Sequence, residues 1–387
     1  MSETKQPTVQ DTVTFIHTAD LQLGMRRHVF NADTQSRFTQ DRIDVITTLM
    51  DTAKTQDAQF VVIAGDMFDD NLVDKQTVRR ALDAFHRAPT IPVFILPANH
   101  DPLDPASVYL TDTFQNHCPE HVTVLTDTTE HHVTQNVTVV GAPWRTRKHA
   151  TNPLTELAAT LTDHEHIRIV VAHGGVDTAG GAYDAVTNVL FQKDLDALVH
   201  AEKAQYVALG DRHSTTQVGE TNRVWFSGAP EATSPRETDP GNVLTVTLNR
   251  EDITVTPIRV GRWQFVNHIA EVDSDTAIER FITWLNDPTR DRARTVLRVS
   301  LAGVVTLAQH ARLMAALDDA HDVYASLNRW ERHDTLTVAP DDNDFDAMNL
   351  AGFVADAFDA LRRDADTDPV AAGALALMYQ LALKAEQ

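Results

Sequence analysis

The chain has 387 residues, of which 42% are hydrophobic and 23% are charged, so it can bury the core of one large domain and one or two smaller ones. Its formal net charge of −22 excludes a broadly basic surface, so any binding of a polyanion must be local, at a metal site or a small basic cluster. Its single cysteine, Cys118, excludes an intrachain disulfide, and without a signal-like start or a long apolar run we expect a soluble, cytoplasmic protein with no membrane segment.

The first half of the chain alternates short β-branched runs with amphipathic helical stretches, which is typical of a layered α/β domain. Five runs are predicted as strands: VTFIH at 13–17, FVVIA at 60–64, PVFIL at 92–96, IRIVVAH at 167–173 and YVALG at 206–210. Two helical stretches between them each show one apolar face, the first with Ile43, Ile46, Met50 and Ala53, the second with Val78, Ala81, Leu82 and Phe85. We expect these helices to cover the sheet.

Other runs are predicted to be antiparallel and indicate a mixed core of two sheets: VTVL at 122–125, a pair around 133 and 137–143, and VWFSGAP at 224–230 with the long run 243–260. After Gly261 strands and helices alternate again, with apolar residues at 278, 281, 282 and 285 and a strand at 296–301. This pattern indicates a small α+β domain over 263–340.

An acidic turn at 341–346 opens a helical tail, 341–387. Its apolar face consists of Leu350, Phe353, Val354, Ala357, Phe358 and Leu361. Such a face has to be covered, so it either packs back on the chain's own domains or binds a partner.

Side chains of metal-ligand type follow each of the five predicted strands. They are Asp20 and Gln22 in HTADLQLG, Asp66 in AGDMFDD, Asn99 and His100 in PANHD, His173 in AHGG, and Asp211 and His213 in LGDRH. Each motif alone is what an ordinary turn or cap would show. Ligand sites in α/β proteins, however, collect outside the carboxyl ends of strands, where five chain-distant loops can meet. Together the motifs predict one metal site.

In order and spacing these motifs resemble the calcineurin-like metallophosphoesterases, whose pattern runs D-x-H, G-D-x-x-D, G-N-H-D/E, H and G-H-x-H. The HTAD-x-x-LG opening is similar to that of the SbcD-type DNA double-strand-break repair exonucleases. The resemblance implies a four-layer α/β/β/α sandwich over 1–262, followed by a capping domain and the helical tail. It also implies two metal ions that share Asp66. Asp20, Gln22 and His213 would complete one metal position, and Asn99, His173 and Asp211 the other.

Two cations about 3.5–4 Å apart can orient a phosphate and generate the hydroxide that attacks phosphorus. His100 is expected to stabilise the transition state or protonate the leaving oxygen, with Asp101 orienting it. A mixed oxygen and imidazole shell favours Mn²⁺, with Zn²⁺ or Fe²⁺ as alternatives. Gln22 and Asp211 stand where the family pattern has histidine. Asp211 adds a negative charge that favours hard cations, whereas Gln22 is a poorer ligand.

Two arginines are candidate substrate contacts. Arg212 lies between two expected ligands, and Arg145 belongs to the basic-aromatic cluster WRTRK at 144–148, which is either a solvated loop or a site of phosphate contact and aromatic stacking.

The leading hypothesis is a phosphodiester hydrolase acting on DNA ends, an exonuclease or endonuclease in DNA repair. The resemblance adds a coiled-coil, SMC-like ATPase partner and a homodimer. The alternatives are a phosphodiesterase of small nucleotides and a catalytically reduced subunit of an ATPase complex.

Overall fold

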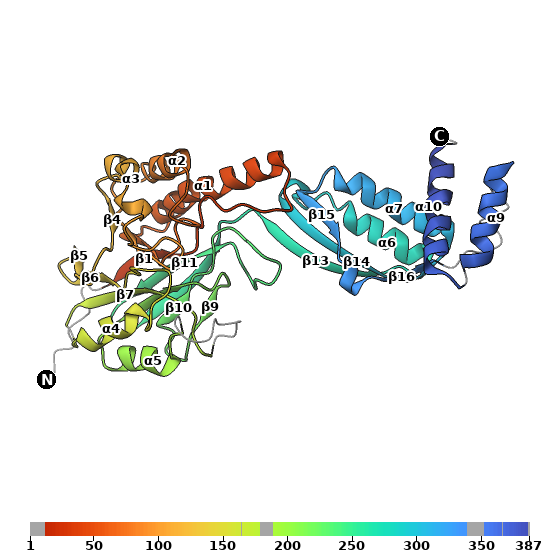
Figure 1. Cartoon of the computed structure of the whole chain (residues 1–387). Coiled ribbons are helices and arrows are strands. Elements are labelled where there is room, and N and C mark those ends of the chain that lie inside the picture. Colours follow the sequence, from red (N-terminus) through yellow and green to blue (C-terminus); the bar gives the residue numbers. More distant parts are fainter. Residues whose placement is uncertain (1–11, 164, 179–188, 339–351, 366, 386–387) are drawn as a thin grey trace. The chain divides into compact units, whose positions relative to one another are not determined.

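The first of two compact units is a four-layer sandwich (Figure 1). The computed structural model describes residues 12–163, 165–178, 189–338, 352–365 and 367–385. Its two units are Met1–Trp263 and Gln264–Gln387. In the first unit two six-stranded sheets pack face to face, and helices cover the outer face of each sheet. The predicted α/β/β/α fold is therefore confirmed.

The first sheet has the strand order β12-β11-β1-β2-β3-β4. These strands are β1 Val13–Thr18, β2 Phe60–Ile63, β3 Val93–Ile95, β4 Val122–Val124, β11 Asn242–Leu248 and β12 Ile253–Arg259. β1 to β4 are parallel, and β11 is antiparallel to both β1 and β12. The antiparallel prediction for 122–125 is wrong. The helix α3, Asp112–His117, lies between β3 and β4, so the chain crosses over instead of turning in a hairpin.

The second sheet has the order β5-β6-β7-β8-β10-β9. Its strands are β5 His131–Thr134, β6 Val137–Gly141, β7 Ile167–His173, β8 Tyr206–Gly210, β9 Thr216–Gln217 and β10 Val224–Phe226. The predicted antiparallel pairs β5/β6 and β11/β12 are confirmed. The run at 224–230 is different, because β10 pairs in parallel with β8 and antiparallel with β9, and not with 243–260.

Alternating side chains along the strands explain the layers. In β1, Phe15 points into the core between the sheets, whereas Ile16 packs in the core under the outer helices. The outer helices are α1 Ala32–Thr55 and α2 Lys75–Phe85, with α3, on the first sheet, and α4 Pro153–Thr160 and α5 Gln192–His200 on the second. The predicted apolar faces of α1 and α2 are buried, so both helices cover the sheet as expected. Three apolar cores thus separate the four layers.

The second unit is an α+β domain with two further helices. Its elements are β13 Gln264–Glu271, α6 Asp275–Leu285, β14 Thr295–Val305, α7 Leu307–His321, β15 Ser326–Arg329, β16 Thr335–Val338, α9 Phe353–Ala365 and α10 Pro369–Ala385. Short 3-10 helices occur at Val108–Leu110, Arg292–Arg294 and Glu331–His333. The sheet is parallel, with β14 paired to β13, β15 and β16.

The apolar face of the tail is only partly covered. Phe358 is buried with Leu307, Ala311 and Leu375 of the same unit, whereas Phe353 is 83% exposed. Leu350 lies outside the described residues. The prediction that the face packs back on the chain is therefore confirmed at Phe358, and partner binding by the exposed part of the face stays a prediction.

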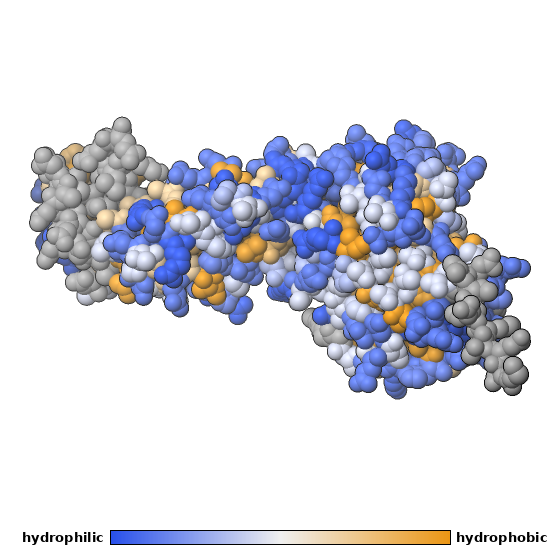
Figure 2. All heavy atoms as spheres, turned by 180° about the vertical axis from the view of Figure 1, so that it is seen from behind, coloured by the Kyte–Doolittle hydropathy of each residue, from blue (hydrophilic) through white to orange (hydrophobic). Residues whose placement is uncertain are grey.

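The outer surface is largely polar on the face seen from behind. Figure 2 shows a face that is mostly hydrophilic, with small, separate hydrophobic areas. Among the described residues, no helix has both the length and the apolar composition needed to cross a membrane.

Candidate metal centre

The five predicted motifs lie at the carboxyl ends of parallel strands in the two sheets. Asp20, Asp66 and Asn99 follow β1, β2 and β3, while His173 ends β7 and Asp211 follows β8. Backbone hydrogen bonds join the loops, with the amide of Asp20 donating to Gly65 O (3.0 Å) and the amide of Gln22 donating to Asp66 O (2.9 Å). The sheet order therefore brings chain-distant side chains together, as ligand sites in α/β folds require.

Four of these residues occupy the left-handed region of the backbone map. The φ angles are 56° at Asp20, 44° at Gln22, 52° at Asp66 and 100° at Asp211. A residue with a side chain costs roughly 1–3 kcal/mol in such a conformation, and it persists only where its surroundings enforce it. Strain of this kind concentrates at functional sites, and four of the eight non-glycine residues with positive φ in the described part of the chain are predicted ligands; the others are Asp57, Glu202, Asn222 and Asp239.

A buried arginine on α1 binds the backbone of the strained loop that follows β1. Arg42 of α1 is 1% exposed and donates two hydrogen bonds to Leu21 O, from Nε (2.9 Å) and from Nη2 (2.6 Å). Its guanidinium also faces the ring of Phe38, at 5.1 Å from the centroid. Leu21 stands between Asp20 and Gln22, so Arg42 fixes the backbone that presents both side chains.

Two glycines make room for His173 at the centre of the site. A Cβ on Gly65, whose φ is +98°, would collide with Nδ1 of His173. A Cβ on Gly210 would collide with Ala64 O and approach the same imidazole nitrogen. Only glycine fits at these two positions while His173 remains between the sheets.

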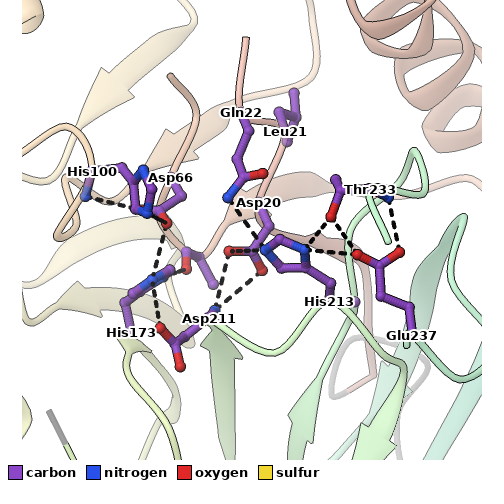
Figure 3. Close-up of polar contacts among 12 residues, drawn as sticks. Asp20, Leu21, Gln22, Asp66, His100, His173, Asp211, His213, Thr233 and Glu237 are labelled. Atoms are coloured by element: carbon purple, nitrogen blue, oxygen red, sulfur yellow. Dashed lines mark hydrogen bonds and ion pairs between the residues drawn. The ribbon is translucent and has the colours of Figure 1, made fainter. Parts of the chain in front are cut away.

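The side chains of the predicted ligands converge on one place, and several of their donor atoms lie at distances beyond a good hydrogen bond (Figure 3). His173 Nε2 lies 3.4 Å from Asp66 Oδ2 and 3.8 Å from Asp211 Oδ1. His213 Nε2 lies 3.9 Å from Asp20 Oδ1. Donor atoms of Asp20, Asp66 and His173 all lie within 4.8 Å of one another. These separations are too long for good hydrogen bonds but suit ligands that share a cation at about 2 Å from each.

Three buried polar atoms support a cation directly. His173 Nε2, Gln22 Oε1 and Asn99 Oδ1 have no hydrogen-bond partner among the described residues. His173 Nδ1 donates to Ala64 O (2.8 Å), so the opposite nitrogen, Nε2, faces the site and is the atom that a cation would bind in place of a proton. Leaving such acceptors buried and unsatisfied is costly. The donor set therefore fits a metal ion.

The protonation equilibria also indicate that the site needs positive charge. Burial raises the pKa of Asp20 to about 6, with Asp66 and Asp211 adding to the effect of burial. Burial alone would lower the pKa of His173, but Asp66, Asp20 and Asp211 together raise it to about 10. The carboxylates thus favour a positive charge at the position of His173, and a divalent cation bound there would supply such a charge.

His100 lies at the edge of the same cluster, while Asp101 has a different role from the predicted one. His100 Nδ1 donates to Asp69 O (2.8 Å), and its Nε2 lies 3.9 Å from Asp66 Oδ2. The carboxylate of Asp101 accepts hydrogen bonds from Phe68 N (3.0 Å), Ala98 N (2.9 Å) and the hydroxyl of Tyr109 (2.6 Å). Asp101 therefore holds the motif loops together, and the carbonyl of Asp69 orients His100 instead.

The two candidate substrate arginines lie on loops beside the site, but the predicted aromatic stacking partner is not available. Trp144 is fully buried, and its indole donates to His173 O (3.2 Å), because the turn after β6 folds inward over the core. Stacking of a base on Trp144 is therefore ruled out. Arg145 is exposed and donates to Thr126 O (3.2 Å), and Arg212 Nε donates to Thr216 Oγ1 (2.9 Å).

Sequence reasoning missed the residues behind the ligands. Asn152 donates to His173 O (2.9 Å), and Glu237 and Thr233 contact His213 Nδ1 (Figure 3). Asn152 has a weak signal, since it precedes a proline and caps α4. Glu237 lies in an irregular loop with no local pattern, so nothing in the sequence could have indicated its role.

Comparisons with known proteins agree with this geometry. The sequence profile described as "Calcineurin-like phosphoesterase" matches residues 13–225, which is more than half of the chain and includes every predicted ligand. The DNA double-strand break repair protein Mre11 of Archaeoglobus fulgidus is 33% identical over 89 residues, 22% of this chain and 19% of that protein. The chain thus aligns with about a fifth of this relative's length.

Two similar solved structures are phosphatases. A dimetal phosphatase from Danio rerio is 14% identical with a TM-score of 0.41, and the alignment covers 63% of this chain and 98% of that one. The purple acid phosphatase PPD1 from yellow lupin (Lupinus luteus) seeds is 12% identical with a TM-score of 0.39, and the alignment covers 64% and 52% of the two chains.

Proposed function

The chain belongs to the calcineurin-like phosphoesterases, and on that premise we propose that it is a two-metal phosphodiester hydrolase that acts on DNA ends. The observation that carries the proposal is the buried Nε2 of His173, which has no hydrogen-bond partner among the described residues and lies 3.4 Å from Asp66 Oδ2 in a cluster that includes Asp20. Two divalent cations bound there supply the charge that polarises a phosphodiester and lowers the pKa of an attacking water.

Asp66 is the residue best placed to serve both cations. Its carboxylate is buried, faces His173 Nε2 at 3.4 Å, and accepts a hydrogen bond from the amide of His100 (3.1 Å). Asp20, Gln22 and His213 would complete one metal position, and Asn99, His173 and Asp211 the other. Oxygen donors outnumber imidazoles in this set, which favours Mn²⁺ over softer metals.

His100 is proposed to act on the phosphodiester itself. The side chain is 42% exposed, and its Nδ1–H is held by Asp69 O, so Nε2 is directed to where a substrate would bind. Burial lowers the pKa of His100, but Asp66 and Asp69 reverse this effect and raise it above its ordinary value. A protonated His100 can donate to a phosphoryl oxygen in the transition state or to the leaving oxygen.

DNA as the substrate is supported by the Mre11 relative and by basic residues around the site. Arg27 on the loop after β1 donates to Thr233 O, which joins that loop to the one carrying the exposed Arg236. On the turn after β6, at the same edge of the sheet as His173, Arg145 is exposed. These arginines, with Arg212, supply local positive charge on an acidic chain, as phosphate contacts require.

We further propose an ATPase partner for the tail. Phe353 on α9 and Val370 on α10 are 83% and 78% exposed, so the described part of the chain leaves their apolar surface uncovered. A helical partner such as the base of a coiled-coil ATPase could cover it, and the chain itself is proposed to form a homodimer, as its SbcD-like opening implies.

The test is hydrolysis of an end-labelled DNA duplex and of bis(p-nitrophenyl) phosphate with Mn²⁺, by the wild type, Asp66→Asn and a control, Asp57→Asn. Asp57 also has a positive φ, 50°, but it is exposed and precedes β2, at the opposite end from the site. Hydrolysis of both substrates, lost only in Asp66→Asn, is expected. Hydrolysis of the small ester alone would favour a nucleotide phosphodiesterase or a requirement for the ATPase. No hydrolysis would favour the catalytically reduced subunit.

A further inference from the structure

We propose that Glu237 is a positioning residue for the metal position formed by Asp20, Gln22 and His213, and that it offsets the weak amide ligand Gln22. This inference rests on the proposed function. It assigns a role to a residue outside the matched region 13–225, on the loop before β11.

The contacts of Glu237 fix the ring of His213. His213 Nδ1 lies 3.0 Å from Glu237 Oε1 and 2.8 Å from Thr233 Oγ1. The hydroxyl of Thr233 in turn donates to Glu237 Oε1, and its backbone amide donates to Oε2 (2.9 Å). The Glu237 side chain is 6% exposed, so this arrangement is shielded from water. Because an ionised carboxylate only accepts hydrogen bonds, Nδ1 must carry the proton and Nε2 the lone pair.

The lone pair of His213 faces the cluster beside Gln22. Nε2 lies 3.9 Å from Asp20 Oδ1 and 3.3 Å from Gln22 Nε2, and the amide oxygen of Gln22 is buried without a partner among the described residues. A half-turn of the amide exchanges its nitrogen and oxygen without changing its shape, and it would place two acceptors side by side. A cation at this position would then have Asp20, the amide oxygen of Gln22 and Nε2 of His213 as ligands, in addition to the shared Asp66.

Each proposed metal position has one carboxylate besides Asp20 and Asp66, and the two positions differ in where this carboxylate lies: Asp211 at the position of His173, and Glu237 at the position of His213. At the other position Asp211 faces the cluster directly, and His173 Nδ1 donates to a neutral backbone carbonyl, Ala64 O. At this position the corresponding ligand is the neutral Gln22, and the carboxylate stands behind the histidine. A carboxylate that accepts the Nδ1–H of a histidine makes Nε2 a stronger metal ligand and fixes the orientation of the ring. Removing such a carboxylate typically lowers metal affinity 10- to 100-fold.

The experiment compares metal binding by the wild type, Glu237→Gln and Glu231→Gln in Mn²⁺ titrations read by electron paramagnetic resonance and calorimetry. Glu231 is a matched control, because it is 1% exposed and near Glu237 in the chain, and among the described residues its carboxylate accepts hydrogen bonds from the backbone amides of Arg262 and Trp263. Arg42 donates to its backbone oxygen, which the substitution leaves in place. We expect Glu237→Gln to weaken one of two Mn²⁺ sites 10- to 100-fold and to replace the signal of a coupled Mn²⁺ pair by that of a single ion, while Glu231→Gln keeps the pair.

Several outcomes would overturn the role of Glu237. They are two Mn²⁺ bound by Glu237→Gln with wild-type affinity, loss of both ions from a folded Glu237→Gln variant, and an equal effect in Glu231→Gln. If Glu237→Gln does not fold, Thr233→Val removes one of the two contacts to His213 Nδ1 and must weaken the same single site. A wild type that binds fewer than two Mn²⁺ ions would instead overturn the proposed function itself.

Discussion

Replacing Arg42 by methionine should separate the stability of the fold from the quality of the metal site. The substitution removes two charged hydrogen bonds to Leu21 O, of 2.9 and 2.6 Å, each contributing about 1.5–3 kcal/mol. In the opposite direction, burial lowers the pKa of Arg42 from 12.5 to about 10, which corresponds to a cost of about 3 kcal/mol for keeping the charge buried at neutral pH. The free energy of unfolding should therefore fall by only about 0–3 kcal/mol.

The effect on metal binding should be larger than this stability change suggests. Without Arg42, Asp20 and Gln22 can leave their left-handed conformations, at φ of 56° and 44°, and binding must then restore them. Restoring strain of roughly 1–3 kcal/mol lowers Mn²⁺ affinity about 5- to 150-fold. Calorimetric titration with Mn²⁺ measures this affinity, and urea unfolding in the presence of EDTA measures the stability of the metal-free protein.

Arg168→Met is the matched control for this experiment. Arg168 is 2% exposed and donates to Glu130, Thr162 O and Lys203 O, but it lies near the start of β7, whereas His173 ends that strand. The Arg168→Met variant should have a lower free energy of unfolding than the wild type and the same affinity for Mn²⁺. Wild-type affinity in Arg42→Met, or an equal loss of affinity in both variants, would refute the reasoning.

Three further outcomes are expected. His100→Ala should lower hydrolysis about 10²- to 10⁴-fold and leave the metal content, measured by inductively coupled plasma mass spectrometry, unchanged; loss of metal would make His100 a ligand instead. Removing metal with EDTA should lower the melting temperature, since 1 mM Mn²⁺ at a micromolar site stabilises the fold by about 4 kcal/mol; an unchanged temperature would contradict a bound metal. Burial, opposed by a hydrogen bond to Leu209 O, lowers the pKa of His17 from 6.5 to about 3. Below pH 6.5 the unfolded chain therefore binds a proton that the fold excludes, and from pH 7 to pH 5 the wild type should lose about 2 kcal/mol more stability than His17→Gln; equal losses would show that His17 is protonated in the fold.

The parts of the fold that depend on local pattern could be predicted from the sequence. β7 and β8 have the limits that their β-branched runs indicate, and the ligand-type residues follow strands whose ends meet because the strands are parallel. The direction of β4 and the pairing of β10 could not be predicted, because both depend on which strand each one lies beside. A short apolar run has the same pattern in either case.

The contacts that hold the ligand loops in place could not be predicted from the sequence, because they too depend on the tertiary fold. Arg42 reads as a polar position on an amphipathic helix, and only the tertiary fold brings its guanidinium under Leu21, 21 residues away. Trp144 reads as an exposed aromatic beside basic residues, yet it is buried against His173 O. Asp101, next to His100 in sequence, points away from it to Tyr109 and two backbone amides. Proximity along the chain indicates which loop a side chain belongs to, but not its direction.

The most direct test of the two-metal claim is a crystal of the wild-type protein grown with Mn²⁺ and measured on both sides of the manganese absorption edge. The account predicts two anomalous peaks about 3.5–4 Å apart, one on each side of the Asp66 carboxylate, with His173 beside one peak and His213 beside the other. A single peak, or two peaks away from Asp66, would contradict it.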